Sequence, residues 1–236
     1  MARLGEHIPR LLSSRGFEVA FGLPSLPTME IARGYEGSGL HAIGVRDAAH
    51  AAFMADGYAR VSGSPAACIA PYGPGLTALA TPAAQALADS VPMLLLVTGQ
   101  RETPDGRRGG HRHTLRDPAA LIGSVCVGYH KVTDAEALPA MLDQAVATLH
   151  RERPGPVCVE VPETLLAQEA GQLAETEQAK PPPLPEMKLP APAMIAELLM
   201  RLAEAERPVI ILGGGAVGIG AKAATALAER IGAAVL

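Results

Sequence analysis

Two histidines close together in the chain are its first candidates for proton-transfer chemistry. His111 and His113 stand in the stretch Gly110-His111-Arg112-His113-Thr114-Leu115, and further arginines precede it. A neutral imidazole accepts or donates a proton near neutral pH, so these side chains could relay a proton to a carbanion formed on a substrate. The alternative is a surface loop whose arginines and histidines attract an acidic substrate. The residue types make His113, and after it His111, candidate catalytic residues.

Two glycine-containing segments have the composition of backbone cradles for a ligand. Gly73-Pro74-Gly75 follows an apolar run and precedes a helical pattern, so it would either present backbone N–H groups in a fixed geometry or simply make a turn. Residues 213–218 fit G-x-G-x-x-G between a strand and a helix. Such glycines let N–H groups approach a phosphate, although they also make a tight turn. The acid that would confirm a dinucleotide site is expected about twenty residues later, beyond Leu236.

Composition and charge exclude several classes of protein. The 236 residues are 48% hydrophobic, which supports a buried core and argues against a disordered chain. The formal net charge is −4 and no block of Lys or Arg occurs, so a nucleic-acid partner is not expected. With three Phe, four Tyr and no Trp, a base-stacking or carbohydrate-binding face is not expected either.

The cysteines and the apolar runs point to a cytoplasmic protein with no membrane partner. Cys68, Cys126 and Cys158 lie far apart in apolar runs, which favours buried, reduced thiols. No Cys-x-x-Cys or Cys/His ligand spacing occurs, so we assign no metal ligand. The N-terminus lacks the apolar core of a signal peptide, and the longest apolar stretch, 91–97, is too short to cross a bilayer.

Short apolar runs alternate with helical patterns along residues 1–165. The runs that read as fully buried strands are 19–22, 42–45, 66–70, 93–98, 125–129 and 157–161. The helical segments between and before them are 5–16, 48–61, 76–88 and 135–151. This alternation predicts an α/β fold with a doubly wound, mostly parallel six-stranded sheet and helices on both faces. We expect the loops 22–25, 72–76 and 98–115 at the carboxyl edge of this sheet, where such folds bind ligands.

The chain changes character after the last of these strands. Residues 166–192 are rich in Pro and Glu, which is typical of a stiff linker between domains. Residues 193–236 then read as helix, strand, glycine run, helix and the start of a strand, which is how a Rossmann-like α/β domain begins. One such unit cannot bury both faces of a sheet, so we expect a second domain that is cut short or completed by another chain.

Several short motifs occur along the chain in a fixed order. They are Phe21-Gly22-Leu23-Pro24, Asp56-Gly57-Tyr58-Ala59-Arg60, Gly73-Pro74-Gly75, Ala88-Asp89-Ser90-Val91-Pro92, Thr98-Gly99-Gln100, Arg153-Pro154-Gly155-Pro156-Val157 and Arg207-Pro208-Val209. Together they resemble the thiamine-diphosphate enzymes, and within them the acetolactate synthase-like branch. The resemblance covers nearly the whole chain.

The resemblance implies a three-domain enzyme that acts on a 2-oxo acid. The first domain would hold the aminopyrimidine of thiamine diphosphate, with Pro24, Ala48 and Gly73-Pro74-Gly75 at cofactor-contacting positions. Mg²⁺ would hold the diphosphate through a last domain whose Gly-Asp-Gly motif does not occur in these 236 residues. Whether FAD occupies the central domain is left open. The site of the family forms between subunits, so the resemblance implies a homodimer or homotetramer, with the diphosphate-binding domain supplied by another subunit or by a C-terminal part.

One departure from the family's pattern concerns the activation of the cofactor. In the family, a Glu hydrogen-bonds the aminopyrimidine and favours the tautomer that removes the C2 proton of the thiazolium. Counting back from Gly57, that position is Ala48, whose methyl group cannot accept a hydrogen bond. Asp47 precedes it, and a shift of one residue would make Asp47 the activating carboxylate. The alternative is that Asp47 caps the helix that begins there. Tyr72 and Ala78 also replace a Ser and an Asn of the family.

These features leave three hypotheses for the function. The first is the N-terminal portion of a thiamine-diphosphate-dependent 2-oxo-acid decarboxylase or carboligase, which works by ylide addition and enamine transfer. The second is a non-catalytic relative that serves as an assembly or regulatory subunit, which Ala48 favours. The third is one chain of a split enzyme. The coding sequence beyond Leu236 and the neighbouring genes would distinguish them.

Overall fold

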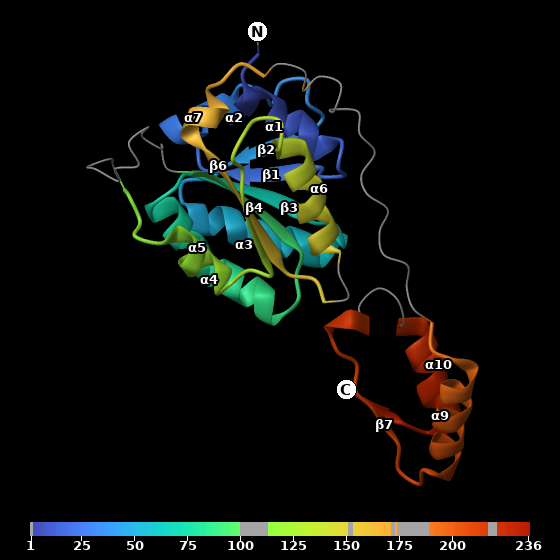
Figure 1. Cartoon of the computed structure of the whole chain (residues 1–236). Helices are drawn as coiled ribbons and strands as arrows, with labels where there is room; N and C mark the ends of the chain where they lie inside the picture. The colour runs from blue at the N-terminus through green and yellow to red at the C-terminus, as the bar shows by residue number, and fades with distance from the viewer. Residues whose placement is uncertain (1, 100–112, 151–152, 171–172, 174–188, 217–220) are drawn as a thin grey trace. The chain divides into compact units, whose positions relative to one another are not determined.

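The computed structural model describes residues 2–99, 113–150, 153–170, 173, 189–216 and 221–236 (Figure 1). The chain divides into two units, residues 1–185 and 186–236, and each is described by itself below. Most of the expected linker over residues 166–192 lies outside the described residues.

The first unit is built on one parallel sheet. Its strands are β1 (Val19–Gly22), β2 (His41–Gly44), β3 (Ala66–Ala70), β4 (Met93–Gly99), β5 (Gly128–Lys131) and β6 (Pro156–Pro162). They lie in the order β2-β1-β3-β4-β6-β5, and every neighbouring pair is parallel. The expectation of a doubly wound, six-stranded parallel sheet is therefore confirmed.

Helices cover both faces of this sheet (Figure 1). One face packs against α1 (Leu4–Ser13), α2 (Met29–Ala32), α6 (Leu138–Leu149) and α7 (Glu163–Leu166). The other face packs against α3 (Ala48–Ser62), α4 (Pro74–Ala88) and α5 (Pro118–Gly123). In β4 the residues alternate between the two cores, with Leu94 and Leu96 in the first and Leu95 and Val97 in the second. All seven residues of β4 are buried, which explains the continuous apolar run in the sequence.

A charged network ties α3 to α4 within the second core. Asp56 is 3% exposed, and its carboxylate accepts hydrogen bonds from Arg60 Nε at 2.8 Å and from Gln85 Nε2 at 3.3 Å. Arg60 Nη2 also donates to Asp89 Oδ2 at 2.7 Å. A buried carboxylate is stable only when it is paired and hydrogen-bonded, so this network holds the two helices in one arrangement.

Two expected strands differ from their predicted form. Residues 42–45 were expected to be fully buried, but β2 is an edge strand whose residues are mostly exposed. The strand expected at 125–129 begins three residues later than predicted, because β5 begins at Gly128. The preceding α5 accounts for the shift: Asp117 caps it with its side chain, Pro118 is its first residue, and Val125 N still donates to Ile122 O at its end.

The three cysteines are buried and free, as expected. Burial raises the pKa of Cys126 to about 12 and also raises the pKa of Cys68 and of Cys158, so these thiols stay protonated at neutral pH. Among the described residues, no helix is long and apolar enough to cross a membrane.

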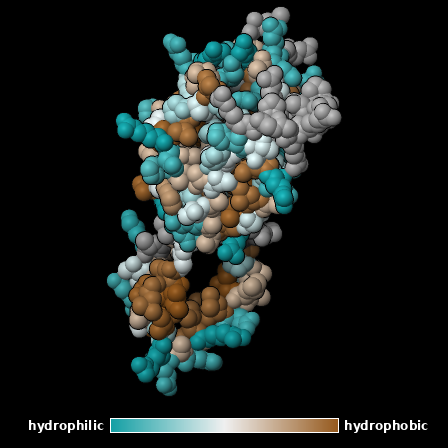
Figure 2. Space-filling view, turned by 90° about the vertical axis from the view of Figure 1, so that its left-hand side faces the viewer, coloured by the Kyte–Doolittle hydropathy of each residue, from teal (hydrophilic) through white to brown (hydrophobic). Residues whose placement is uncertain are grey.

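The second unit contains α9 (Pro192–Glu204), β7 (Val209–Ile210), η2 (Gly214–Ala216), α10 (Ala221–Ile231) and β8 (Ala234–Val235). The strands β7 and β8 are parallel, and Leu236 N donates to Ile210 O at 2.9 Å. Apolar side chains gather on the surface of this unit (Figure 2). The second helix expected in this unit begins at Ala221 in the described part, and residues 217–220, which include the end of the glycine motif, lie outside it.

We predict that Asp56→Ala lowers the free energy of unfolding of the chain by about 2–3 kcal/mol, because it leaves Gln85 and Arg60 without their buried acceptor. Asp89→Ala is the matched control: its side chain is 51% exposed, so its loss should cost less than about 1 kcal/mol. Urea unfolding of both variants measures the difference. Equal losses would show that the buried carboxylate does not hold α3 on α4.

Candidate functional site at the carboxyl edge of the sheet

The order of the strands creates a switch point at β1. The chain leaves β1 for β2 on one side and then returns past β1 to β3 on the other side. Ligands of open α/β sheets bind beyond the carboxyl ends of the strands at such a point. Pro24 follows β1, Ala48 follows β2, and Gly73 follows β3, so the three positions singled out in the sequence lie at one edge of the sheet.

Asp47 and Ala48 form the start of α3 at this edge. Asp47 is exposed, and its Oδ1 accepts a hydrogen bond from Ala49 N at 2.7 Å. The helix cap expected for Asp47 is therefore present. Ala48 is 2% exposed and packs in the apolar cluster that contains Phe21 and Ala51. The structure thus gives the carboxylate a structural partner and buries the methyl group. A role of either residue toward a cofactor stays a prediction.

The segment Gly73-Pro74-Gly75 makes the turn from β3 into α4. Gly73 has φ 68° and ψ −121°, a backbone conformation that only glycine adopts readily. Pro74 is the first residue of α4, and a side chain at Gly75 would lie 2.9 Å from the ring of Pro71. The first-turn N–H groups of a helix have no partner within it, so this turn presents backbone donors at the switch point.

His113 lies directly against this turn. A Cβ atom at Gly73 would lie 2.4 Å from both Cβ and the carbonyl oxygen of His113, so the two residues touch through their backbones. His113 is exposed and has φ 65°, which is uncommon for a residue with a side chain. The structure therefore brings His113 against the turn after β3. His111 and most of the loop 98–115 lie outside the described residues.

A buried carboxylate at the same edge was not expected from the sequence. Glu160 in β6 is 5% exposed, and its Oε2 accepts a hydrogen bond from Tyr129 Oη at 2.7 Å. Burial and this hydrogen bond raise the pKa of Tyr129, so its hydroxyl stays a donor. A side chain at Gly99 would meet Glu160 Oε1 at 2.7 Å, so glycine is needed there. The signal that could have revealed this pair is a single charged residue inside an apolar strand.

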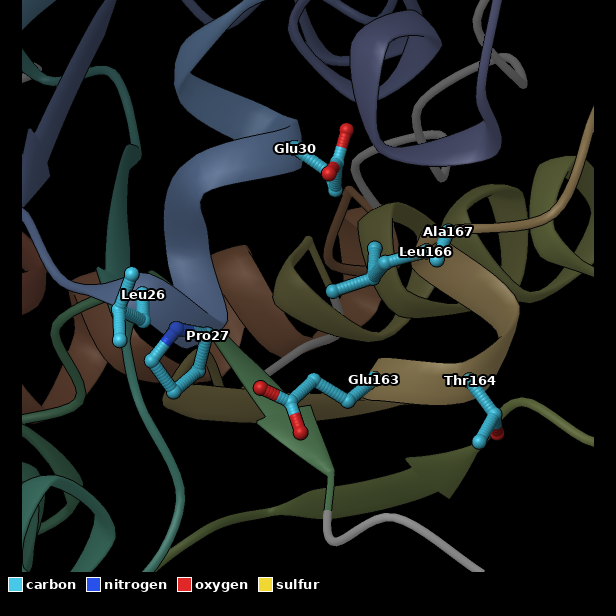
Figure 3. Close-up of a pocket in the computed structure, with 7 residues that line it drawn as sticks. All are labelled: Leu26, Pro27, Glu30, Glu163, Thr164, Leu166 and Ala167. Atoms are coloured by element: carbon cyan, nitrogen blue, oxygen red, sulfur yellow. The ribbon is translucent and has the colours of Figure 1, made fainter.

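A cavity opens beside this edge (Figure 3). Its volume is about 360 Å³, and it lies between the turn after β1 and the helix after β6. Its lining residues are Leu26, Pro27, Glu30, Glu163, Thr164, Leu166 and Ala167. The sequence could not reveal it, because its two walls are more than a hundred residues apart in the chain.

Comparison with known proteins decides the family. Residues 2–121 match the family described as "Thiamine pyrophosphate enzyme, N-terminal TPP binding domain". The chain belongs to the thiamine pyrophosphate enzymes. The resemblance drawn from the sequence motifs is confirmed.

Two curated relatives and one solved structure illustrate the likeness. The probable 2-ketoarginine decarboxylase AruI of Pseudomonas aeruginosa is 37% identical over 229 residues, which are 97% of this chain and 40% of that protein. The chloroplastic acetolactate synthase of Arabidopsis thaliana is 33% identical over 86% of this chain and 30% of that protein. The thiamine diphosphate-dependent 4-hydroxybenzoylformate decarboxylase of Rhodococcus jostii RHA1 shares the fold, with a TM-score of 0.84 at 24% identity over 99% of this chain and 44% of that chain. This chain spans less than half the length of each of them.

We predict that Gly73→Ala lowers the free energy of unfolding by about 3 kcal/mol, because the new methyl group meets both strained backbone and His113. Gly63→Ala is the matched control. Gly63 also has a positive φ of 73°, but its Cβ would meet nothing within 4 Å, so the expected loss is about 1 kcal/mol. Urea unfolding measures both losses, and the NMR signals of His113 should move only in Gly73→Ala. Equal losses would contradict the contact between the two loops.

Proposed function

We propose that this chain is the N-terminal portion of a thiamine-diphosphate-dependent enzyme that acts as a decarboxylase or carboligase on a 2-oxo acid. The observation that carries the proposal is the family match over residues 2–121. These residues contain the loops that follow β1, β2 and β3, which form the switch-point edge. The relatives named as a 2-ketoarginine decarboxylase and an acetolactate synthase support this class of reaction.

The described residues fit the aminopyrimidine of the cofactor by shape and by their backbone groups. Pro24 is exposed after β1, and the turn at Gly73 offers N–H donors at the same edge, whereas Ala48 is buried in the core beside them. When bound, thiamine diphosphate supplies a carbon nucleophile for the carbonyl group of a 2-oxo acid. The residues of this chain would orient its ring and exclude water from one side of it.

The carboxylate that the family directs at the ring is the point of disagreement. Ala48 has none, and the carboxylate of Asp47 caps α3. Among the described residues, no three His, Cys, Asp or Glu side chains are grouped to hold a metal ion. We propose that Mg²⁺ and the diphosphate are held by a domain outside these residues, in a homodimer or homotetramer. FAD stays a candidate ligand of the central domain.

The proposed role of His113 is to hold or deliver a proton near the reacting carbon. This proposal is supported by the exposure of His113 and by its contact with the turn at Gly73. An imidazole there can change its protonation state near neutral pH. His111 remains the second candidate for this role.

We further propose that the domains are 1–165 for the cofactor ring, 166–192 for a linker and 193–236 for the start of a central Rossmann-like domain. The turn η2 at Gly214–Ala216 leads from β7 toward α10, which is the arrangement that glycine-rich nucleotide-binding turns have.

A non-catalytic assembly or regulatory subunit is the second candidate function. The observation that favours it is the start of α3, where the methyl group of Ala48 is buried and the nearest carboxylate already has a partner. In a split enzyme, a separate chain would supply the diphosphate domain. Once both chains are present, we expect it to bind thiamine diphosphate and act on a 2-oxo acid as the first candidate does.

We predict that residues 1–236 alone show no Mg²⁺-dependent heat with thiamine diphosphate in calorimetry. The diphosphate and its metal ordinarily require a carboxylate cluster, which we assign to another domain. The complete protein, or the two chains of a split enzyme, should bind the cofactor under the same conditions. Tight Mg²⁺-dependent binding by residues 1–236 would contradict the assignment.

We predict that Ala48→Glu in the complete protein speeds the exchange of the C2 hydrogen of the cofactor by roughly ten- to a hundredfold. The reason is that a charge-assisted hydrogen bond to the ring is worth about 1.5–3 kcal/mol, and each 1.36 kcal/mol is tenfold in rate. Hydrogen–deuterium exchange followed by NMR after acid quenching measures the rate.

Asp47→Asn is the control for this experiment, because Asn retains the capping hydrogen bond but has no negative charge. Exchange should be unaffected by Asp47→Asn if Asp47 only caps the helix. If Asp47→Asn abolishes exchange and Ala48→Glu changes nothing, Asp47 is the activating carboxylate. If neither variant changes the rate, the non-catalytic function is favoured.

A further inference from the structure

The turn over residues 23–28, which follows β1, is incompletely supported by the sheet. A second cavity, of about 70 Å³, lies between this turn and the ends of the first two strands. Pro24 and Thr28 line it from the turn, and Gly22 and Gly44 line it from the strand ends. A packed protein interior leaves few voids larger than a water molecule. Packing against the sheet therefore does not by itself fix the position of Pro24.

The side chain of Thr28 holds the two residues that flank Pro24. Thr28 is 4% exposed, and its hydroxyl donates to Leu23 O at 3.0 Å and accepts from Ser25 N at 3.0 Å. Ser25 Oγ also lies 3.0 Å from this hydroxyl oxygen. A threonine hydroxyl has one donor and two acceptor sites, so these contacts use all of them. The hydrogen bonds of Thr28 are thus directed to the turn.

Pro24 itself contributes no backbone donor to its own position, because proline has no N–H. Before it, Leu23 N donates to Ile69 O at 3.1 Å, which ties the start of the turn to β3. The pairing of β1 with its neighbouring strands ends at Gly22, and beyond Pro24 the amide of Ser25 donates to the side chain of Thr28. The place of Pro24 at the carboxyl edge therefore depends on the hydroxyl group of Thr28.

We propose that Thr28 is a positioning residue for the cofactor. Its hydroxyl holds Pro24 at the edge where the ring of thiamine diphosphate would lie, and it keeps the turn from settling into the cavity beneath. Thr28 acts through Pro24 and does not itself contact the ligand. The inference rests on the proposed function for the identity of the ligand, whereas the dependence of the turn on Thr28 requires only residues of this chain.

The first test concerns the turn and uses the 236-residue chain without cofactor. In Thr28→Val a methyl group replaces the hydroxyl, so the amide of Ser25 loses its acceptor. We expect hydrogen exchange of this amide, followed by NMR, to become about tenfold faster or more, and Thr28→Ser to keep it within about twofold of the wild type. Unchanged exchange in Thr28→Val would overturn the inference.

The matched control for this substitution is Thr148→Val. Thr148 is 2% exposed, and its hydroxyl donates to Gln144 O at 2.8 Å. It lies near the end of α6 that leads into β6, which is at the opposite edge of the sheet. Thr148→Val removes a buried, hydrogen-bonded hydroxyl in the same way, but it should leave the exchange of the Ser25 amide unchanged.

The second test measures the binding of thiamine diphosphate with Mg²⁺ to the complete protein by calorimetry. We expect Thr28→Val to raise the Kd about tenfold, which corresponds to the loss of one well-placed hydrogen bond. Thr28→Ser and Thr148→Val should bind as the wild type does. If Thr28 had a structural role alone, both Thr→Val variants would lose thermal stability and keep the wild-type Kd, and that result would overturn the inference.

A compensating substitution tests the contribution of the cavity. A Cβ atom at Gly44 would lie 3.7 Å from Pro24 Cγ, an ordinary contact distance, so Gly44→Ala should support the proline ring from below without a clash. We expect the double variant Thr28→Val/Gly44→Ala to bind the cofactor within about threefold of the wild type. A Kd as high as that of Thr28→Val alone would overturn the proposal that the turn settles into the cavity.

The two tests separate this inference from the proposed function. A wild-type complete protein that does not bind thiamine diphosphate would contradict the proposed function, whereas the exchange of the Ser25 amide would still decide whether Thr28 holds the turn. Wild-type binding together with an unchanged Kd in Thr28→Val would contradict the role of Thr28 and leave the proposed function intact.

Discussion

The burial of both faces of one parallel sheet is the constraint on which the rest of this structure depends. The residues of β3, β4 and β6 are buried along their whole length, which is possible only because helices cover both faces. Fully burying a Leu or Val side chain contributes roughly 1.5–3 kcal/mol, so these strands strongly stabilise the sheet. Because all six strands are parallel, every loop that follows a strand emerges at the same edge. The position of the candidate site is a consequence of this core.

The stability of the core allows unfavourable local features at that edge. Gly73 and His113 both have positive φ angles and lie in contact, and Glu160 buries a carboxylate that accepts a hydrogen bond from Tyr129. Each such feature costs about 1–3 kcal/mol, and it persists only where the surrounding structure determines it. Ser90, whose φ is 58°, precedes β4 at the opposite edge, so a positive φ does not by itself mark the ligand-binding edge.

The sequence predicted those parts that local patterns control. Continuous apolar runs identified β3, β4 and β6, and the capping of α3 by Asp47, one of the two alternatives for this residue, is present. The exposure of β2 could not be predicted, because a strand's place at the edge depends on topology and not on its own residues. The cavity of Glu163 was also out of reach, because Pro27 and Glu163 meet only in the folded chain. The position of β5 was missed although Asp117-Pro118 carried the signal for a helix start.

The start of α3 links the stability of the fold to its proposed chemistry. The carboxylate of Asp47 caps the helix through Oδ1, which lies 2.7 Å from Ala49 N, and its second oxygen has further acceptor sites. Loss of a cap costs about 0.5–2 kcal/mol, whereas a charged hydrogen bond to a ring nitrogen contributes about 1.5–3 kcal/mol. A contact that keeps the cap would cost the helix nothing, whereas one that breaks it would have to offset the loss of the cap. Because Ala48 beside it has only a methyl group, we propose that any activation of a cofactor from the start of α3 depends on the carboxylate of Asp47.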